Sequence, residues 1–418
     1  MQTPRLTVGA ILAMASWAMM LAVAMPAAAV DEAQLRPELV AKRCFTDIDP
    51  SFSNINWQAD IHIKSDADVQ ALRAALIRQI FPQGFPTGSA NVTMAPATTD
   101  KSDPNASGLY PVFMGDRNSG LKAEYRLTVV LPNGLRSIVF LWVPKSSNNR
   151  LFLAHDGHGN NSYYPDGRVK VPAMVNPTNY VTANTLLNKG FTVVWLQMPL
   201  YGDNLIASNP APPYPSNCLT NQCERHTALF QAYAASATSP YFYFLDPVIA
   251  TLNLVLSKAS YQDVTMMGAS GGGWTTLVAA AIDPRITTSV AVAGSLPMQL
   301  RTGVCGRASL GDGEQQSHPG LLYAKISFLD LYIMASDGPG RQHIQVNNQY
   351  DTCCFFGVTH RGYSDMLESY ISQHNLGRYK YVLDTQFVGH GYDSKTTPPA
   401  ANNTLNEIVL PAIMGGGG

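Results

Sequence analysis

One short stretch limits what this chain can fold into. The apolar run Val264 to Met267 has the length of a buried strand, and Trp274 to Ile282 continues with helix formers and no breaker. Between them lies Gly268-Ala-Ser270-Gly-Gly272, which matches the pattern G-x-S-x-G. A strand-to-helix turn this short needs glycines, because side chains at those positions would collide with the adjoining strand and helix. The stretch therefore predicts a serine exposed on a strained turn.

Ser270 on such a turn indicates a catalytic nucleophile. A serine hydroxyl is a weak nucleophile until an imidazole takes its proton, and a carboxylate must hold that imidazole in the right tautomer. The helix after the turn points backbone N–H groups at the serine and stabilises negative charge there. A glycine-rich turn of a nucleotide-binding α/β protein is the alternative interpretation. Catalysis therefore requires a histidine and a carboxylate elsewhere in the chain.

His390 and Asp351 are the predicted partners of Ser270. His390 is flanked by glycines in a loop between the last predicted strand and the last helix, which places it at the carboxyl edge of the sheet. Asp351 directly follows the predicted strand 343–350, and residues at strand carboxyl ends face the site. Its rival Asp337 lies in Ser-Asp-Gly-Pro-Gly, which is ordinary turn chemistry. Other histidines fit structural or exposed positions better, namely His62, His226, His343, His360 and His374.

Two backbone N–H groups are needed for the oxyanion of a tetrahedral intermediate. The first is predicted to be that of Gly271, directly after the nucleophile. The second is assigned to His158 in His155-Asp-Gly-His-Gly-Asn160, which resembles the glycine-rich oxyanion loop of esterases, with Gly157 as the alternative. A metal site from His155, Asp156 and His158 is the other interpretation, but it lacks a distant fourth ligand. The prediction is that no cofactor and no metal take part.

The rest of the chain predicts an α/β fold. A hairpin at 124–131 and 136–143, turned by Pro132-Asn-Gly134, is followed by alternating strands and helices. Such an order predicts a mostly parallel central sheet with helices on both faces. Beside the stretch around Ser270, the expected strands are 150–155, 191–198, 286–293, 343–350 and 378–383, and the expected helices are 179–188, 246–259, 321–335, 363–374 and 403–414.

The N-terminal part divides into two segments. Residues 1–29 have the basic start, the apolar run and the Ala27-Ala-Ala29 site of a secretory signal peptide, with an uncleaved membrane anchor as the alternative. Residues 30–122 are expected to be a leader with one amphipathic helix, begun by the capping box at Ser65 and Asp68, followed by an irregular loop over 81–120. The leader is expected to pack on the main domain, 123–418.

Two stretches interrupt the alternation and are interpreted as insertions. Residues 201–243 are rich in proline and aromatic residues, and residues 299–320 are rich in glycine and polar residues. Long loops inside compact folds are usually functional, so we expect them to form the walls or lid of a substrate pocket. Ordinary surface loops are the alternative, above all for the second stretch.

Composition excludes some partners. The net charge of −1 and the charged fraction of 14% provide no basic surface for nucleic acid or an anionic membrane. After removal of the signal peptide no stable membrane insertion is expected. The sequence carries no signal for the number of subunits.

The cysteines become informative if the chain is exported, because oxidising compartments allow disulfides. The sequence has six cysteines. Cys218 and Cys223 are close enough to form a local staple. One of the neighbours Cys353 and Cys354 is expected to pair with Cys305 or Cys44.

The order Ser270, Asp351, His390, together with the oxyanion loop and the strand-helix succession, resembles the α/β-hydrolase fold over about 124–414. The resemblance implies an eight-stranded sheet and an acyl-enzyme mechanism without cofactor. It leads us to expect a secreted or periplasmic serine hydrolase acting on small or polymeric carboxylic esters. A peptidase or carbon–carbon bond hydrolase with the same triad is the nearest alternative, and a non-catalytic binding protein on this fold is the third.

Overall fold

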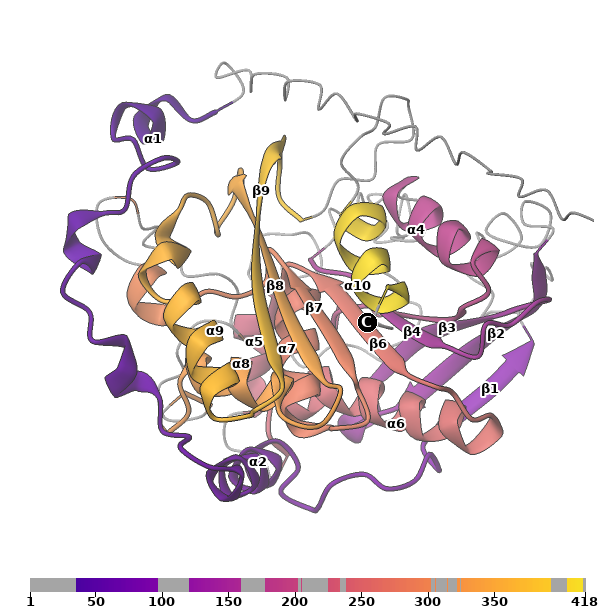
Figure 1. Cartoon of the computed structure of the whole chain (residues 1–418). Helices are drawn as coiled ribbons and strands as arrows, with labels where there is room; N and C mark the ends of the chain where they lie inside the picture. Colours follow the sequence, from indigo (N-terminus) through magenta and orange to yellow (C-terminus); the bar gives the residue numbers. More distant parts are fainter. Residues whose placement is uncertain are drawn as a thin grey trace, which may run out of the picture.

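Nine strands of the described chain form one sheet in the order β1-β2-β3-β5-β4-β6-β7-β8-β9 (Figure 1). The computed structural model describes residues 35–96, 120–158, 177–201, 204, 225–233, 238–301, 305, 314, 322–323, 325–391 and 404–415. The expected signal peptide lies outside these residues. The strands are β1 (Val92–Pro96), β2 (Leu121–Val130), β3 (Arg136–Pro144), β4 (Leu151–His155), β5 (Thr192–Leu196), β6 (Val264–Ala269), β7 (Thr288–Val292), β8 (Gln342–Tyr350) and β9 (Arg378–Val388).

Pairing changes direction once across this sheet. The pairs β1·β2, β2·β3 and β3·β5 are antiparallel, and every pair from β5·β4 to β8·β9 is parallel. Strands β4, β5 and β7 are buried along their whole length, as strands covered on both faces must be. The predicted mostly parallel α/β sheet is confirmed. Parallel pairing brings the carboxyl ends of β4, β6, β8 and β9 to one edge.

Helices cover both faces of the sheet. One apolar core lies between the sheet and α2 (Asp66–Ile80), α6 (Phe242–Lys258), α7 (Gly271–Ile282), α8 (Phe328–Ser336) and α9 (Ser364–Gln373). A second core lies on the opposite face under α4 (Pro177–Asn188) and α10 (Leu410–Met414), which Figure 1 shows next to each other. The remaining helical elements are α1 (Pro37–Ala41), η2 (Pro50–Phe52), η3 (Trp57–Asp60), η4 (Pro132–Gly134), α5 (Arg225–Tyr233), η8 (Met298–Arg301), η9 (Thr359–Gly362) and η10 (Leu405–Val409).

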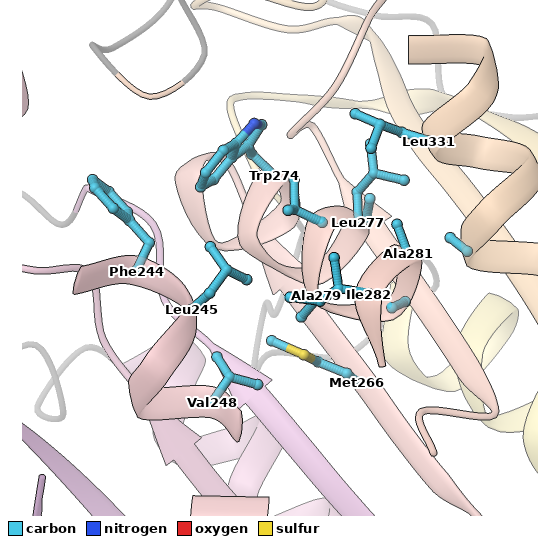
Figure 2. Close-up of a cluster of buried hydrophobic side chains, with 14 of the residues drawn as sticks. Phe244, Leu245, Val248, Met266, Trp274, Leu277, Ala279, Ala281, Ile282 and Leu331 are labelled. Carbon is cyan, nitrogen blue, oxygen red and sulfur yellow. The ribbon is translucent and has the colours of Figure 1, made fainter. Parts of the chain in front are cut away.

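Helix α7 is buried on all sides. All its residues are buried, and Figure 2 shows Trp274, Leu277 and Ile282 among side chains from α6, α8 and β6. A helix that is apolar all round must lie inside a protein. The indole Nε1 of Trp274 donates a hydrogen bond of 2.7 Å to the Tyr323 hydroxyl, so its polar atom is also satisfied. The turn that precedes α7 is therefore anchored in the core.

The ninth strand was not predicted. β1 lies within 81–120, where an irregular loop was expected, and it pairs with β2 at the antiparallel edge. A proline such as Pro96 is tolerated in an edge strand, where its missing N–H is not needed for pairing. The prolines and polar residues around β1 hide the alternating pattern by which a strand is predicted from sequence. The side chain of Asn91 also joins β1 to the rest, since it donates to the Val130 carbonyl and to Asp246. The eight strands implied by the resemblance are thus extended by one.

Two predicted helix starts were wrong. Helix α6 begins at Phe242 rather than at residue 246, because the aromatic residues before Asp246 are buried and continue the helix, leaving Pro247 inside it. Helix α8 begins at Phe328 rather than at residue 321, because Ser327 and Asp330 form a capping box there. The first insertion also contains helix α5.

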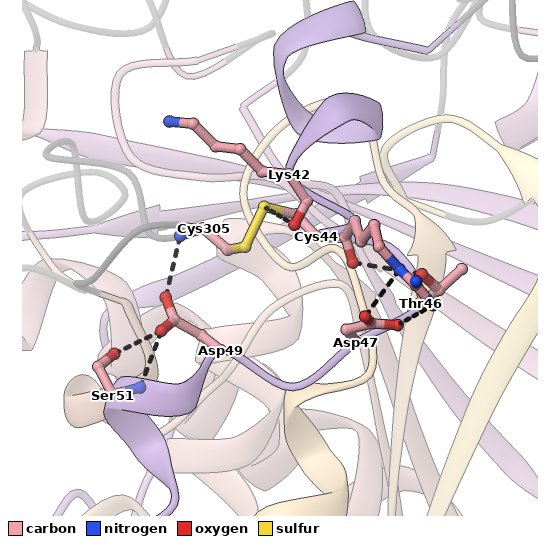
Figure 3. Close-up of a disulfide and its surroundings, with 8 residues drawn as sticks. Lys42, Cys44, Thr46, Asp47, Asp49, Ser51 and Cys305 are labelled. Carbon is pink, nitrogen blue, oxygen red and sulfur yellow. Dashed lines mark hydrogen bonds and ion pairs between the residues drawn. A yellow bond between two sulfur atoms is a disulfide. The ribbon is translucent and has the colours of Figure 1, made fainter.

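The part of the leader before α2 is attached along the edge formed by α8 and α9 (Figure 1). The backbone N–H of His62 donates to Asp330 at 2.8 Å, and the His62 ring lies 2.6 Å from the same carboxylate. The Tyr370 hydroxyl donates to the Ile63 carbonyl at 2.6 Å. A disulfide between Cys44 and Cys305 joins the leader to the second insertion, with Asp49 accepting from the Cys305 N–H at 3.1 Å (Figure 3). No helix among the described residues is long and apolar enough to cross a membrane.

The predicted disulfides need correction. Cys44 pairs with Cys305, and Cys353 pairs with its neighbour Cys354, so neither neighbour reaches Cys305 or Cys44. The Cα atoms of Cys44 and Cys305 lie 5.4 Å apart, within the range that a disulfide spans. The predicted staple of Cys218 and Cys223 lies outside the described residues.

Arg73 is the buried polar contact that docks helix α2. Its guanidinium donates to the carbonyls of Ala281 and Met334 at 2.9 and 3.2 Å, which lie at the last turns of α7 and α8. It also pairs with Asp337 at 3.2 Å. A cation suits this position because helix carboxyl ends carry partial negative charge.

We expect Arg73→Met to lower the free energy of unfolding by about 3 kcal/mol, because it leaves the Ala281 carbonyl and the buried Asp337 carboxylate without their donor, while the Met334 carbonyl keeps a hydrogen bond from Arg341. Urea unfolding of both proteins measures the difference. Arg78→Met on the exposed side of the same helix is the control and should change stability by less than about 0.5 kcal/mol. Equal effects of the two substitutions would contradict the docking role of Arg73.

Candidate active site

Ser270 occupies the tight turn between β6 and α7. Its backbone has φ 54° and ψ −123°, a conformation that costs a residue with a side chain about 1–3 kcal/mol. The turn is held by the Ser270 N–H, which donates to the Val292 carbonyl at 2.9 Å, and by the Trp274 N–H, which donates to the Ser270 carbonyl at 3.0 Å. A side chain at Gly268 would collide with the Gly272 carbonyl, so the glycines predicted for the turn are required by close backbone approach.

Asp351 and His390 are in contact at the same edge of the sheet. Nδ1 of His390 lies 2.9 and 3.1 Å from the two carboxylate oxygens of Asp351. The carboxylate is buried, and it also accepts from the backbone N–H groups of Cys353 and Cys354 at 2.6 and 3.0 Å. The disulfide ring of these two cysteines thus presents two donors to Asp351. The His390 side chain remains 25% exposed, so its other nitrogen is open to a reacting group.

The loop that carries His390 lies against the turn of Ser270 between β6 and α7, which we call the nucleophile elbow. A methyl group at Gly391 would come to 3.8 Å from the Cβ of Ala269, the residue before Ser270. Asn348 in β8 fixes this loop from both sides of His390, because its Nδ2 donates to the carbonyls of Gly389 and Gly391 at 2.9 and 2.7 Å. The sequence analysis did not identify Asn348 as a site residue. The sequence signal for its role is the run of side-chain amides over 345–349, within a strand that has the pattern of a buried strand.

The candidate oxyanion loop lies on the other side of Ser270. A methyl group at Gly157 would come to 2.6 Å from the Ala269 carbonyl oxygen and 2.8 Å from Cβ of Ser270. A methyl group at Gly271 would meet ring atoms of His158 at 2.5 and 2.9 Å. The loop after β4 and the start of α7 are therefore in direct contact around Ser270, where both predicted donors lie.

Among the described residues, His155, Asp156 and His158 do not form the metal site that was the alternative interpretation. Nδ1 of His155 contacts the Asp156 carbonyl oxygen at 2.7 Å, and burial lowers the pKa of His155 to about 4. The carboxylate of Asp156 accepts from the indole of Trp195 at 3.2 Å. Among the described residues, the group with potential ligand atoms close together is instead His158, His226 and Glu314.

The other candidate residues lie away from Ser270. Asp337 pairs with Arg73 at the opposite edge of the sheet, before β8 begins. His343 is buried inside β8, where burial lowers its pKa to about 3 and its Nδ1 lies 2.8 Å from the Ser289 hydroxyl. The remaining histidines contact other groups, with His62 on Asp330, His360 stacked on Tyr381, and His374 on the Tyr370 carbonyl.

No model of a known protein family matches this sequence, and no curated protein is similar to it in sequence. Solved structures are similar to it in fold. A candidate acetyl xylan esterase from Bacteroides fragilis NCTC 9343 has a TM-score of 0.53 at 12% identity, covering 90% of this chain and 94% of that chain. A methylesterase has a TM-score of 0.51 at 14% identity, covering 83% of this chain and 65% of that chain.

The chain has the α/β-hydrolase fold. The resemblance stated from the sequence is thus confirmed for the fold. In an α/β-hydrolase fold the nucleophile lies on the elbow at the carboxyl edge, followed in the chain by an acid and a histidine. Ser270, Asp351 and His390 occur in that order at that edge. β1 is an additional strand at the antiparallel side of this fold.

We expect Gly157→Ala to lower kcat at least about tenfold, because the added methyl group would displace the loop from Ser270. Steady-state kinetics on a chromogenic ester measures the change. Gly88→Ala is the matched control, since no atom lies within 4 Å of the position of its added methyl group. An unchanged kcat in Gly157→Ala would show that the loop does not need this close approach.

Asn348→Asp keeps the size of the side chain and removes the donor to two carbonyls. The loop of His390 then loses the two hydrogen bonds that hold it. We therefore expect kcat to fall about tenfold or more, with KM changing by less than about threefold. The exposed Asn375→Asp on the turn after α9 is the control. A change in KM alone would argue against a role in positioning His390.

Proposed function

We propose that this chain is an exported serine hydrolase that cleaves carboxylic esters through an acyl-enzyme on Ser270. The observation that carries the proposal is the contact of Asp351 with His390 beside the strained Ser270 turn. Nδ1 of His390 faces the carboxylate, so Nε2 is the nitrogen that accepts the serine proton.

The proposed reaction has two halves. In the first, Ser270 Oγ bonds to the ester carbonyl carbon while its proton moves to His390, and the oxyanion is held by the N–H groups of Gly271 and His158. The intermediate then collapses, the bond to the alcohol oxygen breaks, and His390 gives its proton to that oxygen. In the second half, His390 takes a proton from water as the water oxygen attacks the acyl carbon; the bond from that carbon to Ser270 Oγ then breaks, His390 returns the proton to Oγ, and the acid is released. Asp351 orients His390 and stabilises its positive charge throughout.

Esters rather than amides are proposed because the two solved structures described above bear the names of esterases. Both insertions reach the candidate oxyanion loop, since His226 of the first and Glu314 of the second contact the His158 side chain. This placement supports a role of the insertions in enclosing a small or polymeric substrate. Export is supported by the signal-peptide pattern and by the two disulfides among the described residues.

The first experiment treats the purified chain with a fluorophosphonate probe and locates the label by mass spectrometry. We expect labelling at Ser270, none in Ser270→Ala, and a kcat at least about a thousandfold lower in that variant. Ser257→Ala on the exposed side of α6 is the control. Paired nitrophenyl ester and nitroanilide substrates then separate an esterase from a peptidase. A folded protein that takes no label at Ser270 would favour a non-catalytic binding protein.

A further inference from the structure

Three side chains with metal-binding atoms meet beside the candidate oxyanion loop. His158 follows β4, His226 lies in the first turn of α5, and Glu314 belongs to the second insertion. Their potential ligand atoms all lie within 4.8 Å of one another. His226 and Glu314 are fully buried, and the His158 side chain is only 12% exposed. The three segments are far apart in the sequence and are brought together only by the fold.

The hydrogen bond of His226 to Pro199 determines how this cluster is protonated. Nε2 of His226 lies 2.9 Å from the Pro199 carbonyl oxygen, which can only accept, so Nε2 carries a hydrogen. In a neutral imidazole Nδ1 then has a lone pair. That atom lies 2.7 Å from Oε2 of Glu314 and 2.9 Å from Nε2 of His158. A lone pair facing a carboxylate at this distance requires a positive charge between them, either a proton or a cation.

A single proton satisfies the geometry poorly. If it lies on Oε2 of Glu314, the N–H of His158 must reach Oε1 across 3.4 Å, which is long for a hydrogen bond. A proton on Nδ1 of His226 would leave His158 Nε2 as an acceptor, with its lone pair 3.4 Å from Oε1 of Glu314. A second proton on His158 Nε2 would instead face the first across 2.9 Å. A cation between the three groups accepts all their lone pairs at once. The cluster is therefore better suited to a metal ion than to a buried imidazolium.

The ligand set and spacing indicate the class of metal. Two imidazole nitrogens and one carboxylate are the protein ligands of many zinc sites that keep a fourth position open. Ligand atoms around tetrahedral zinc at about 2.1 Å lie about 3.4 Å apart. Nδ1 of His226 lies 2.9 Å from Nε2 of His158 and 2.7 Å from Oε2 of Glu314, while Nε2 of His158 lies 3.4 Å from the other carboxylate oxygen, Oε1. One ligand atom from each residue gives a set within 4.8 Å, so small movements bring the three atoms to the spacing around zinc.

The surroundings hold both imidazoles in place. The Tyr201 ring centre lies 4.8 Å from that of His158 and 5.1 Å from that of His226, and the Phe244 ring packs on His226 at 4.7 Å. The Pro199 carbonyl orients His226 in the way that outer partners orient metal-bound histidines. We propose that His158, His226 and Glu314 bind one divalent transition-metal ion of the zinc class.

Such an ion would connect both insertions to the loop after β4. The ring of His158 packs on Gly271, so holding the ring also holds the position of the His158 backbone next to Ser270. The ion would thus be a positioning group for the oxyanion loop rather than a catalytic one. This consequence rests on the proposed function, whereas metal binding by the cluster does not.

The test uses the full mature chain without an affinity tag, stripped with a chelator and titrated with Zn²⁺ by calorimetry. We expect one Zn²⁺ per chain and a higher melting temperature in the metal-bound protein. Co²⁺ titration should produce the visible absorption of a four-coordinate site. Glu314→Gln and His226→Ala should each weaken binding at least about 100-fold, and the exposed His374→Ala should bind like the unaltered protein.

Two results would overturn the proposal. One is a folded, stripped protein that binds less than one Zn²⁺ per chain and melts at the same temperature with and without it. The other is stoichiometric binding that survives Glu314→Gln, which would place the ion elsewhere. If His226→Ala does not fold, Glu314→Gln decides, because it keeps the size of the side chain. Fluorophosphonate labelling of Ser270 is read independently, so failure of the metal site and failure of the proposed hydrolase are distinguishable.

Discussion

The close approach of the β6 and α7 backbones is the constraint on which this structure depends. Gly268 lets the strand touch the helix, Gly272 lets the helix touch the end of β4, and the buried sides of α7 hold these contacts inside the core. The packing between α6, α8 and β6 in Figure 2 therefore stabilises more than a helix. It stabilises the strained backbone of Ser270, whose conformational cost must be offset by the surrounding contacts.

The parallel strands then collect polar loops at one edge. β4 ends at the loop of His158, β6 at Ser270, β8 at Asp351 and β9 at the loop of His390. Loops alone would leave these groups poorly placed, and each is fixed by a particular contact. The ring of Cys353 and Cys354 supplies donors to Asp351, and Asn348 clamps the His390 loop. Preorganisation of this kind is what catalysis by a serine hydroxyl needs.

The leader and the insertions stabilise this edge from outside. The disulfide of Cys44 with Cys305 links the leader to the second insertion (Figure 3), and Arg73 docks the leader helix onto the carboxyl ends of α7 and α8. The insertions in turn converge on His158 through His226 and Glu314. Segments that look like additions to the α/β-hydrolase fold are thus connected to the candidate site by covalent, ionic and proposed metal contacts.

The sequence by itself determined the local structure and the order of the chemistry. The G-x-S-x-G turn, the hairpin at Pro132–Gly134, the helix start capped by Ser65 and the alternation of strands and helices depend on neighbouring residues, so local pattern was enough. Only the tertiary structure decided which distant groups meet. It paired Asp337 with Arg73, joined Cys44 to Cys305, and brought His226 and Glu314 to His158. Such contacts depend on where loops return to the sheet, and that is set by the packing of the whole core rather than by any short stretch.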